Sequence, residues 1–335
     1  MIGLPTWLRP AAASFLVLPV LLAGAQTWGA AAKEEAAPAG KVELTQRLAP
    51  GPYVLAVTLQ SVTGEAAGPK KKPTQHRTFS SVVALNALAP AANGSQEVEV
   101  VVRRCVDRTE MGGDRTAYDS DSPAETDYRH GAAYEDVLNQ KLVLAVGAGF
   151  TPEKIDGRSI LEGWQGIARS PGPTAGDDRK FVMQVTSLGF LCGIVPGVNS
   201  GRPVAPGDEW LGQAGKFAVY TRLQPRMRLV RIAEGRSGPM AIVDFQAQAR
   251  QEAPKWESRQ TGRLRIDIKS GLVHTVRIET ITESDMRVGS GVSHRSNRDV
   301  WVQTVQAGTE LPKNLPSVDD PVFEKPELPA SDGEK

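Results

Sequence analysis

Long stretches of the chain alternate between apolar and polar residues, and this period of two constrains the fold more than any other feature. Tyr53 to Gln60 is one such stretch, and Arg263 to Lys269 is another. Successive side chains of a β-strand point to opposite faces, so this alternation is typical of strands with one buried face. The turn dipeptides Asn93-Gly94 and Ser270-Gly271 lie between such stretches and predict hairpins.

The strand pattern is interrupted once. Lys141 to Ala148 completes a first set of strands, and a second set runs from Trp210 to about residue 305. Between them, residues 179–195 place apolar side chains at helical spacings, and residues 158–168 favour a shorter helix. Because the links between strands are short, we expect antiparallel pairing. The predicted fold class is α+β, mainly β: a curved antiparallel sheet, half-barrel or sandwich-like, with a one- or two-helix insertion at about residues 158–195.

The N-terminal residues predict export. Residues 11–23 form an apolar core too short to span a bilayer, and small residues in the A-x-A pattern follow it. We therefore expect a signal peptide at residues 1–25, a flexible leader at 26–40 and one β-rich domain at 41–312. No later segment has the length of a membrane span, so the mature chain is predicted to be periplasmic or extracellular.

The C-terminal residues have a different composition. Residues 311–335 hold five prolines, six acidic residues and three lysines. Such a segment offers little apolar surface to offset its ordering entropy. We therefore expect residues 313–335 to form a disordered, Pro-rich acidic tail.

Two cysteines, Cys105 and Cys192, occur in a chain predicted to enter an oxidising compartment. One disulfide is the direct expectation there. Two separate buried thiols are the alternative, because cysteine is among the most buried residue types. Residue types and spacing leave both possibilities open.

Composition and motifs exclude several function classes. The formal net charge of +1 does not suit a nucleic-acid binder. The chain lacks the nucleophile elbow, the zinc-protease motif, the Walker A sequence and the dinucleotide fingerprint. Its four histidines have no metal-ligand spacing, so we expect no cofactor, no metal site and no assigned catalytic residue.

Two charged clusters remain as candidate sites. Residues 118–127 contain Asp119 and Asp121, which would serve as acid and base in a hydrolase or glycan-active enzyme, with His130 as a third group. A solvated loop is the simpler interpretation. Arginines are dense between residues 222 and 236 and recur at Arg263 and Arg265, where we expect them to face solvent and protect strand edges.

The word Ala-Pro-Gly occurs at residues 49–51 and again at 205–207, each time just before an aromatic residue and an alternating stretch. Proline and glycine favour a turn, so both copies are predicted to begin strands.

Four short sequence motifs occur in order along the chain: AYDSD (117–121), KIDG (154–157), RPVAPGDEW (202–210) and GRLRIDIKSGL (262–272). Together they resemble a group of exported bacterial proteins of unknown function. The resemblance implies export and a β-rich domain, and it carries no catalytic residue.

These observations predict an exported, non-enzymatic envelope or periplasmic protein. Its specific form is a half-barrel whose concave face holds an apolar ligand or a lipid-modified envelope partner. The alternative is the hydrolase or glycan-active enzyme that uses Asp119 and Asp121.

Overall fold

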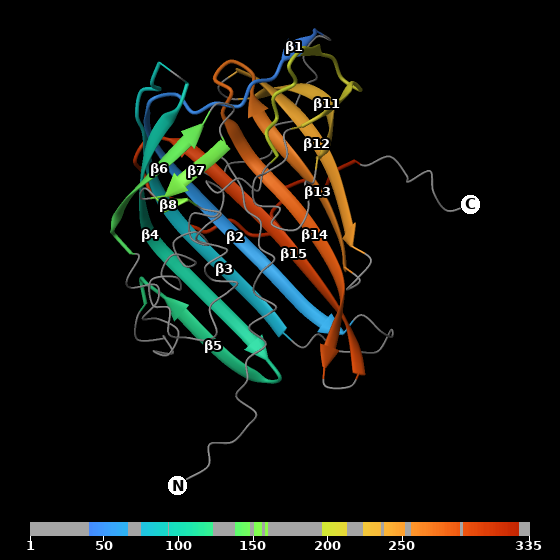
Figure 1. The fold of residues 1–335 in the computed structure, drawn as a ribbon. Coiled ribbons are helices and arrows are strands. Elements are labelled where there is room, and N and C mark those ends of the chain that lie inside the picture. Colours follow the sequence, from blue (N-terminus) through green and yellow to red (C-terminus); the bar gives the residue numbers. More distant parts are fainter. Residues whose placement is uncertain are drawn as a thin grey trace, which may run out of the picture.

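The computed structural model describes residues 40–65, 75–92, 94–122, 138–147, 151–155, 158–159, 196–212, 224–235, 238–251, 256–288 and 291–327. In these residues the chain forms one thirteen-stranded sheet and one two-stranded sheet (Figure 1). The predicted signal peptide, almost all of the leader and the predicted helices within residues 160–195 lie outside this part of the chain. The described residues contain no helix long and apolar enough to cross a membrane.

The strands account for most of the described residues. In chain order they are β1 (Val42–Glu43), β2 (Gly51–Glu65), β3 (Gln75–Ala87), β4 (Gln96–Met111), β5 (Asp114–Asp119), β6 (Lys141–Gly147), β7 (Thr151–Ile155), β8 (Arg158–Ser159), β9 (Pro203–Val204), β10 (Glu209–Leu211), β11 (Arg226–Gly235), β12 (Gly238–Gln251), β13 (Trp256–Asp267), β14 (Val273–Val288) and β15 (Gly291–Ala307). One expectation needs correction: Arg158 and Ser159 form a strand, although they stand at the expected start of the helical insertion.

The large sheet consists of two meanders joined in the middle. Its order is β10-β11-β12-β13-β14-β15-β2-β3-β4-β6-β7-β8, and β5 pairs with β4 outside this path. β15 and β2 join the meanders through a long antiparallel ladder from Arg295↔Glu65 to Ala307↔Tyr53. The β13–β14 hairpin predicted at Ser270-Gly271 is confirmed, as is the expected antiparallel β-sheet.

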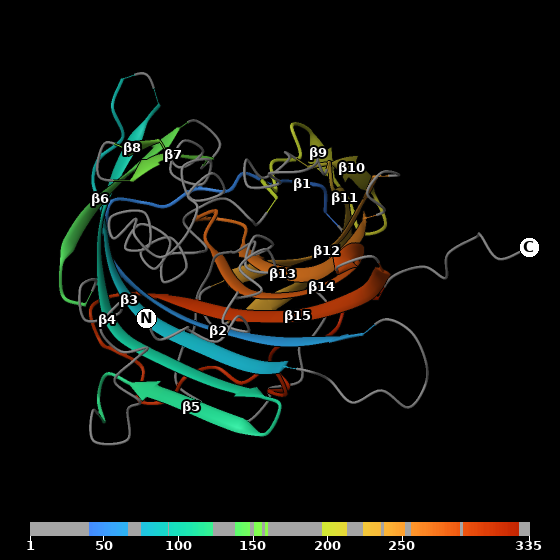
Figure 2. The same cartoon turned by 60° about the horizontal axis from the view of Figure 1, so that its bottom comes forward.

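The sheet is strongly curved and open (Figure 2). Register shifts interrupt the β3–β4, β6–β7, β11–β12 and β13–β14 pairs. Such β-bulges bend and twist a strand locally, which gives curvature to a sheet of this width. Alternate residues of each strand therefore face either the concave or the convex side.

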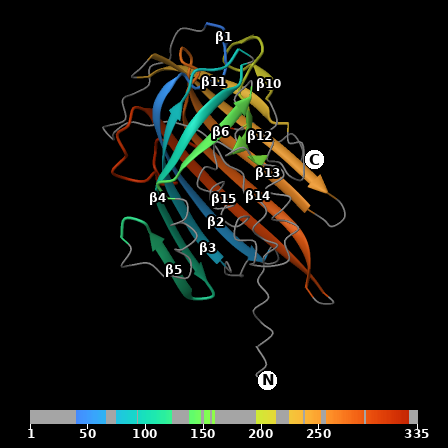
Figure 3. The ribbon, with the colours of Figure 1, turned by 60° about the vertical axis from the view of Figure 1, so that its left-hand side comes forward.

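One end of the concave side is covered by the chain before β2. β1 pairs with β9, and the backbones of Leu44 and Ser200 are also hydrogen-bonded, 2.9 Å from Ser200 N to Leu44 O. Residues 44–50 then cross the ends of the strands: Arg47 N donates to the carbonyl of Gly271 at 3.1 Å, and Gln96 donates to the carbonyl of Leu48 at 3.0 Å. We call this the covered end. β5 lies toward the opposite end (Figure 3).

The convex side carries residues 311–327, which we call the strap. This contradicts the expected disorder of the tail as far as residue 327. Val318 and Phe323 of the strap are buried against Val300 and Val302 of β15. Leu315 packs on a second small cluster formed by β2 and β3. The strap prolines restrict the chain to an extended form before it packs, which lowers the entropy that ordering must offset. Residues 328–335 lie outside the described part.

Candidate functional site

The concave face is apolar near the covered end. In β2 this face carries Tyr53, Leu55, Val57 and Leu59, the same residues that alternate in the sequence, and all are buried. Strand pairing places equivalent side chains beside them, so that Ile278, Trp301, Leu59 and Phe79 form one row across four strands. The resulting cluster extends from β6 to β11.

Farther from the covered end, the concave face becomes polar. One row of polar or charged side chains runs across five strands, and the next row away from the covered end is polar as well. We call these two rows the polar belt; the first consists of Gln260, Thr280, Asp299, Ser61 and Arg77, and the second of Ser258, Thr282, Asn297 and Thr63. The concave face thus has an apolar part next to the covered end and a polar part beyond it.

Asp299 is the central residue of the polar belt and is only 5% exposed. Its Oδ2 accepts a hydrogen bond from Nδ2 of Asn297 at 2.7 Å, and Oδ1 of Asn297 accepts from the hydroxyls of Ser61 and Thr63. Within the described structure, Oδ1 of Asp299 has no hydrogen-bond partner. Burial raises the pKa of Asp299 to about 6, although hydrogen bonding to Ser61 and Asn297 and the charge of Arg77 act in the opposite direction.

Gln303 is a second buried polar group on the concave face of β15. Its Oε1 accepts a hydrogen bond from the indole Nε1 of Trp301 at 2.8 Å, while its Nε2 has no partner among the described residues. Within the described part of the chain, Trp301 therefore lies between a carboxylate oxygen of Asp299 that has no donor and the amide nitrogen of Gln303, which has no acceptor. Buried polar atoms of this kind are destabilising unless a partner satisfies them.

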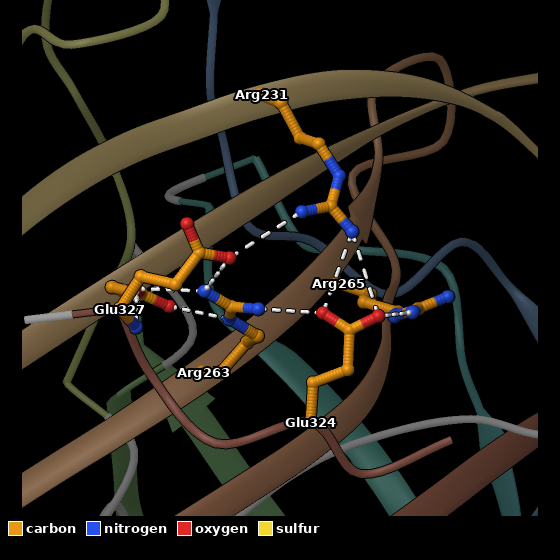
Figure 4. A network of polar contacts seen from close by, with 6 residues as sticks. Arg231, Arg263, Arg265, Glu324 and Glu327 are labelled. Carbon is orange, nitrogen blue, oxygen red and sulfur yellow. Dashed lines mark hydrogen bonds and ion pairs between the residues drawn. The ribbon is translucent and has the colours of Figure 1, made fainter. Parts of the chain in front are cut away.

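On the convex side, charged residues fasten the strap to the sheet (Figure 4). Arg263 of β13 pairs with Asp244 of β12 through two bonds of 2.7 and 2.9 Å, and both side chains are almost completely buried. Arg263 also donates to Glu324 at 2.5 Å and to Glu327 at 3.0 Å. Arg265 and Arg231 complete the cluster by donating to Glu324.

The electrostatics of the strap cluster are balanced, with three arginines facing three carboxylates. Burial alone would lower the pKa of Arg263, but its carboxylate partners raise it above the usual value. Burial likewise would raise the pKa of Glu324, but Arg265, Arg263 and Arg231 hold it below its usual value. The expected solvent-facing role of these arginines is wrong for Arg263, because the strap covers it.

A pocket of about 220 Å³ lies between the strap and strands β2 to β4. Asp119 lines it, together with Arg104, Arg108 and several hydroxyl-bearing side chains. Arg104 binds two carboxylates of the acidic cluster, at 2.9 Å to Asp119 and 3.1 Å to Asp121. Burial would raise the pKa of Asp119, but the hydrogen bond from Arg104 holds it below the usual value. A low pKa does not suit a general acid.

Several predicted features fall outside the described residues or remain predictions. Cys105 is buried on β4, with its sulfur 3.9 Å from the hydroxyl of Ser81. Cys192 and His130 lie outside the described part of the chain. The described residues contain no disulfide, so the pairing of Cys105 with Cys192 stays a prediction. Among the described residues, no group of three or more His, Cys, Asp or Glu side chains could hold a metal ion.

Comparisons with known proteins identify no family. No family model matches the chain, and no curated protein matches it. One similar solved structure is described as lipid–protein interactions in lipovitellin. It is 10% identical, with a TM-score of 0.44, and the match covers 80% of this chain. The chain spans only 27% of that protein's length.

Proposed function

We propose that this protein is an exported carrier or binding module that holds an apolar ligand on the concave face of its sheet. The observation that carries the proposal is the division of that face into an apolar part at the covered end and a polar belt beyond it. Ligand sites that enclose apolar molecules combine a mainly apolar wall with a few placed polar groups.

The covered end supports the same proposal. A sheet with an apolar face needs further structure to exclude water from it. Residues 44–50 and the β1/β9 pair supply such a cover at one end, beside the apolar part of the face. Export follows from the N-terminal sequence pattern alone and is part of the proposal.

The direct test is to purify the full chain without detergent, extract it with organic solvent and identify bound molecules by mass spectrometry. We expect a long-chain apolar or amphiphilic molecule at a fixed stoichiometry. After extraction, the refolded protein should bind a fluorescent apolar probe saturably. Absence of both a co-purifying molecule and saturable probe binding would refute the proposal.

β2 offers a matched pair of variants. Val57 and Val54 are both buried valines of this strand, on the concave and convex faces respectively. Val57→Thr keeps the shape but adds a hydroxyl to the proposed binding surface, and we expect about fivefold weaker probe binding. Val54→Thr should leave binding unchanged. Equal losses in both variants would mean that binding follows general stability, which contradicts a concave site.

The acidic cluster does not supply a second candidate function. Asp119 and Asp121 share one guanidinium, and the lowered pKa of Asp119 favours an ion pair over proton transfer. Their contacts explain how β5 and the turn after it are held against β4.

A further inference from the structure

The pocket beside the strap has a floor of polar side chains from three neighbouring strands. Gln60 of β2, Thr78 of β3 and Arg108 of β4 are paired in register and form one row of this floor. Neighbouring strands lie about 4.8 Å apart, so the row is about 10 Å wide. Within the described part of the chain, none of these three side chains forms a hydrogen bond. Their donors and acceptors are therefore available to a molecule in the pocket.

The strap forms another wall of the pocket and limits its size. Leu315 and Pro316 supply apolar surface to this wall, and Asp319 supplies a carboxylate. The volume of about 220 Å³ is smaller than the ~300–1,000 Å³ of pockets that enclose drug-sized ligands. At about 30 Å³ for each molecule of liquid water, it corresponds to roughly seven waters. A single six-membered ring with small substituents matches this space.

The charges of the lining side chains cancel. Two arginines, Arg104 and Arg108, and two aspartates, Asp119 and Asp319, line the pocket. Arg104 is already paired with Asp119 at 2.9 Å. Two charges of each sign favour neither an anion nor a cation over a neutral molecule. Guanidinium groups only donate hydrogen bonds and carboxylates only accept them, so a matching ligand has to do both.

From this arrangement we propose that the pocket binds one sugar ring, as a free monosaccharide or as the terminal residue of a glycan. A hydroxyl group both donates and accepts. A ring with several hydroxyls therefore satisfies Arg108, Thr78 and Gln60 together. The carbon atoms of the ring pack on Leu315 and Pro316. This site lies on the convex side of the sheet and is separate from the proposed apolar site.

Saturation-transfer NMR with the full-length wild-type protein tests the proposal. The probes are the methyl glycosides of glucose, galactose, mannose and N-acetylglucosamine, together with tetrahydropyran-2-methanol, which keeps the ring but has a single hydroxyl. We expect saturable binding of at least one methyl glycoside and about tenfold weaker binding of the one-hydroxyl ring. The assignment is overturned if no methyl glycoside binds, or if the one-hydroxyl ring or inorganic phosphate binds as tightly as the sugars.

A disaccharide that ends in the preferred sugar separates the two sources of the ring. Binding of the disaccharide at least as tight as that of the methyl glycoside assigns the end of a glycan, and much weaker binding assigns a free monosaccharide. No sugar should displace the fluorescent apolar probe, because the two proposed sites lie on opposite faces of the sheet. Displacement would place the sugar on the concave face and contradict the assignment.

Thr78→Val locates the sugar, because it removes one hydroxyl from the row with little change of shape. The matched control is Thr109→Val. Thr109 is also a half-buried strand residue, and it follows Arg108 on β4, so its side chain points to the other face of the sheet. We expect about fivefold weaker sugar binding for Thr78→Val and no change for Thr109→Val. Equal losses would contradict a site in this pocket. The wild-type probe series decides the question even if Thr78→Val does not fold.

Discussion

Gly262 lies on the concave face of β13 beside Phe245 of β12. A Cβ at this position would overlap the Phe245 ring and lie 2.7 Å from the carbonyl oxygen of Arg277. The absence of a side chain at Gly262 therefore lets the aromatic ring lie flat against the sheet, an arrangement known to protect glycines in strands.

We predict that Gly262→Ala lowers the free energy of unfolding by about 1–3 kcal/mol, because overpacking forces the ring or the backbone to move. Urea denaturation measures this change. The double variant Gly262→Ala with Phe245→Leu should recover part of the loss relative to Phe245→Leu alone. If Gly262→Ala is as stable as the wild-type protein, the Phe245 ring packs less closely on Gly262 than in this structure.

The raised pKa of Asp299 predicts that the stability of the protein depends on pH. Its folded-state pKa of about 6 lies above the ordinary aspartate value of 3.8, so the folded protein binds the proton more tightly than the unfolded chain. Its contribution to stability is therefore fully present below about pH 4 and is lost as pH rises through about 6. The charged groups near it are Arg77 and the Asp107 carboxylate that pairs with Arg77 at 2.7 Å.

We expect the stability difference between Asp299→Asn and the wild-type protein, both free of ligand, to change with pH. From pH 4 to pH 8 the variant should gain roughly 1–3 kcal/mol relative to the wild type, since each pKa unit corresponds to about 1.4 kcal/mol. Thermal or urea unfolding at several pH values measures the difference. A difference that does not vary with pH would show that Asp299 titrates in the folded state as it does in the unfolded chain.

The strap is the element whose contribution to stability is most easily measured by itself, because truncation of the chain removes it. It crosses the convex face from the pocket beside β3 to the Arg263 cluster, and it buries Val318 and Phe323 on β15. It also places the carbonyl of Val318 2.5 Å from the guanidinium of Arg277. Removing it would expose both apolar and buried charged groups.

We predict that a chain ending at Glu310 loses about 3–5 kcal/mol of stability, mainly from the two buried apolar side chains. Exposure of Val300 and Val302 should also increase the fluorescence of a hydrophobic dye. A chain ending at Glu327 is the control and should behave as the full chain does. Equal stability of the two truncated chains would mean that the strap does not pack on the sheet in solution.

The strands could be predicted from sequence because a strand with one buried face alternates between apolar and polar residues with a period of two. The strap could not, since an extended segment rich in proline has no such period and its anchors, Leu315, Val318 and Phe323, are irregularly spaced. One signal was present in β15. Val300-Trp301-Val302 is a run of consecutive apolar residues, which indicates a strand covered on both faces.

The candidate site could be predicted only in outline. The apolar residues at alternate positions of β2 indicated a strand with one buried face. Alternation does not reveal which strands become neighbours in the sheet. The polar belt arises from register, because Gln260, Asp299 and Arg77 are far apart in sequence and meet through strand pairing. Asp299 also follows an arginine and precedes an apolar run, so its local sequence resembles an ordinary strand edge.

At the scale of the whole molecule, both Ala-Pro-Gly words lie just before strands of the same sheet. Gly51 begins β2, and Gly207, at a φ of +93°, turns the chain between β9 and β10. Their positions confirm the predicted strand-entry role. Each opens one of the two meanders, so the repeated word coincides with the division of the sheet into two halves.

The ladder between β2 and β15 joins residues near the start of the domain to residues near its end. Until β15 has left the ribosome, the first meander would present β2 as a long unpaired edge, which is a template for aggregation. Closing such a large loop is also slow compared with forming local hairpins. Folding of the complete sheet therefore has to wait until the whole chain has been synthesised.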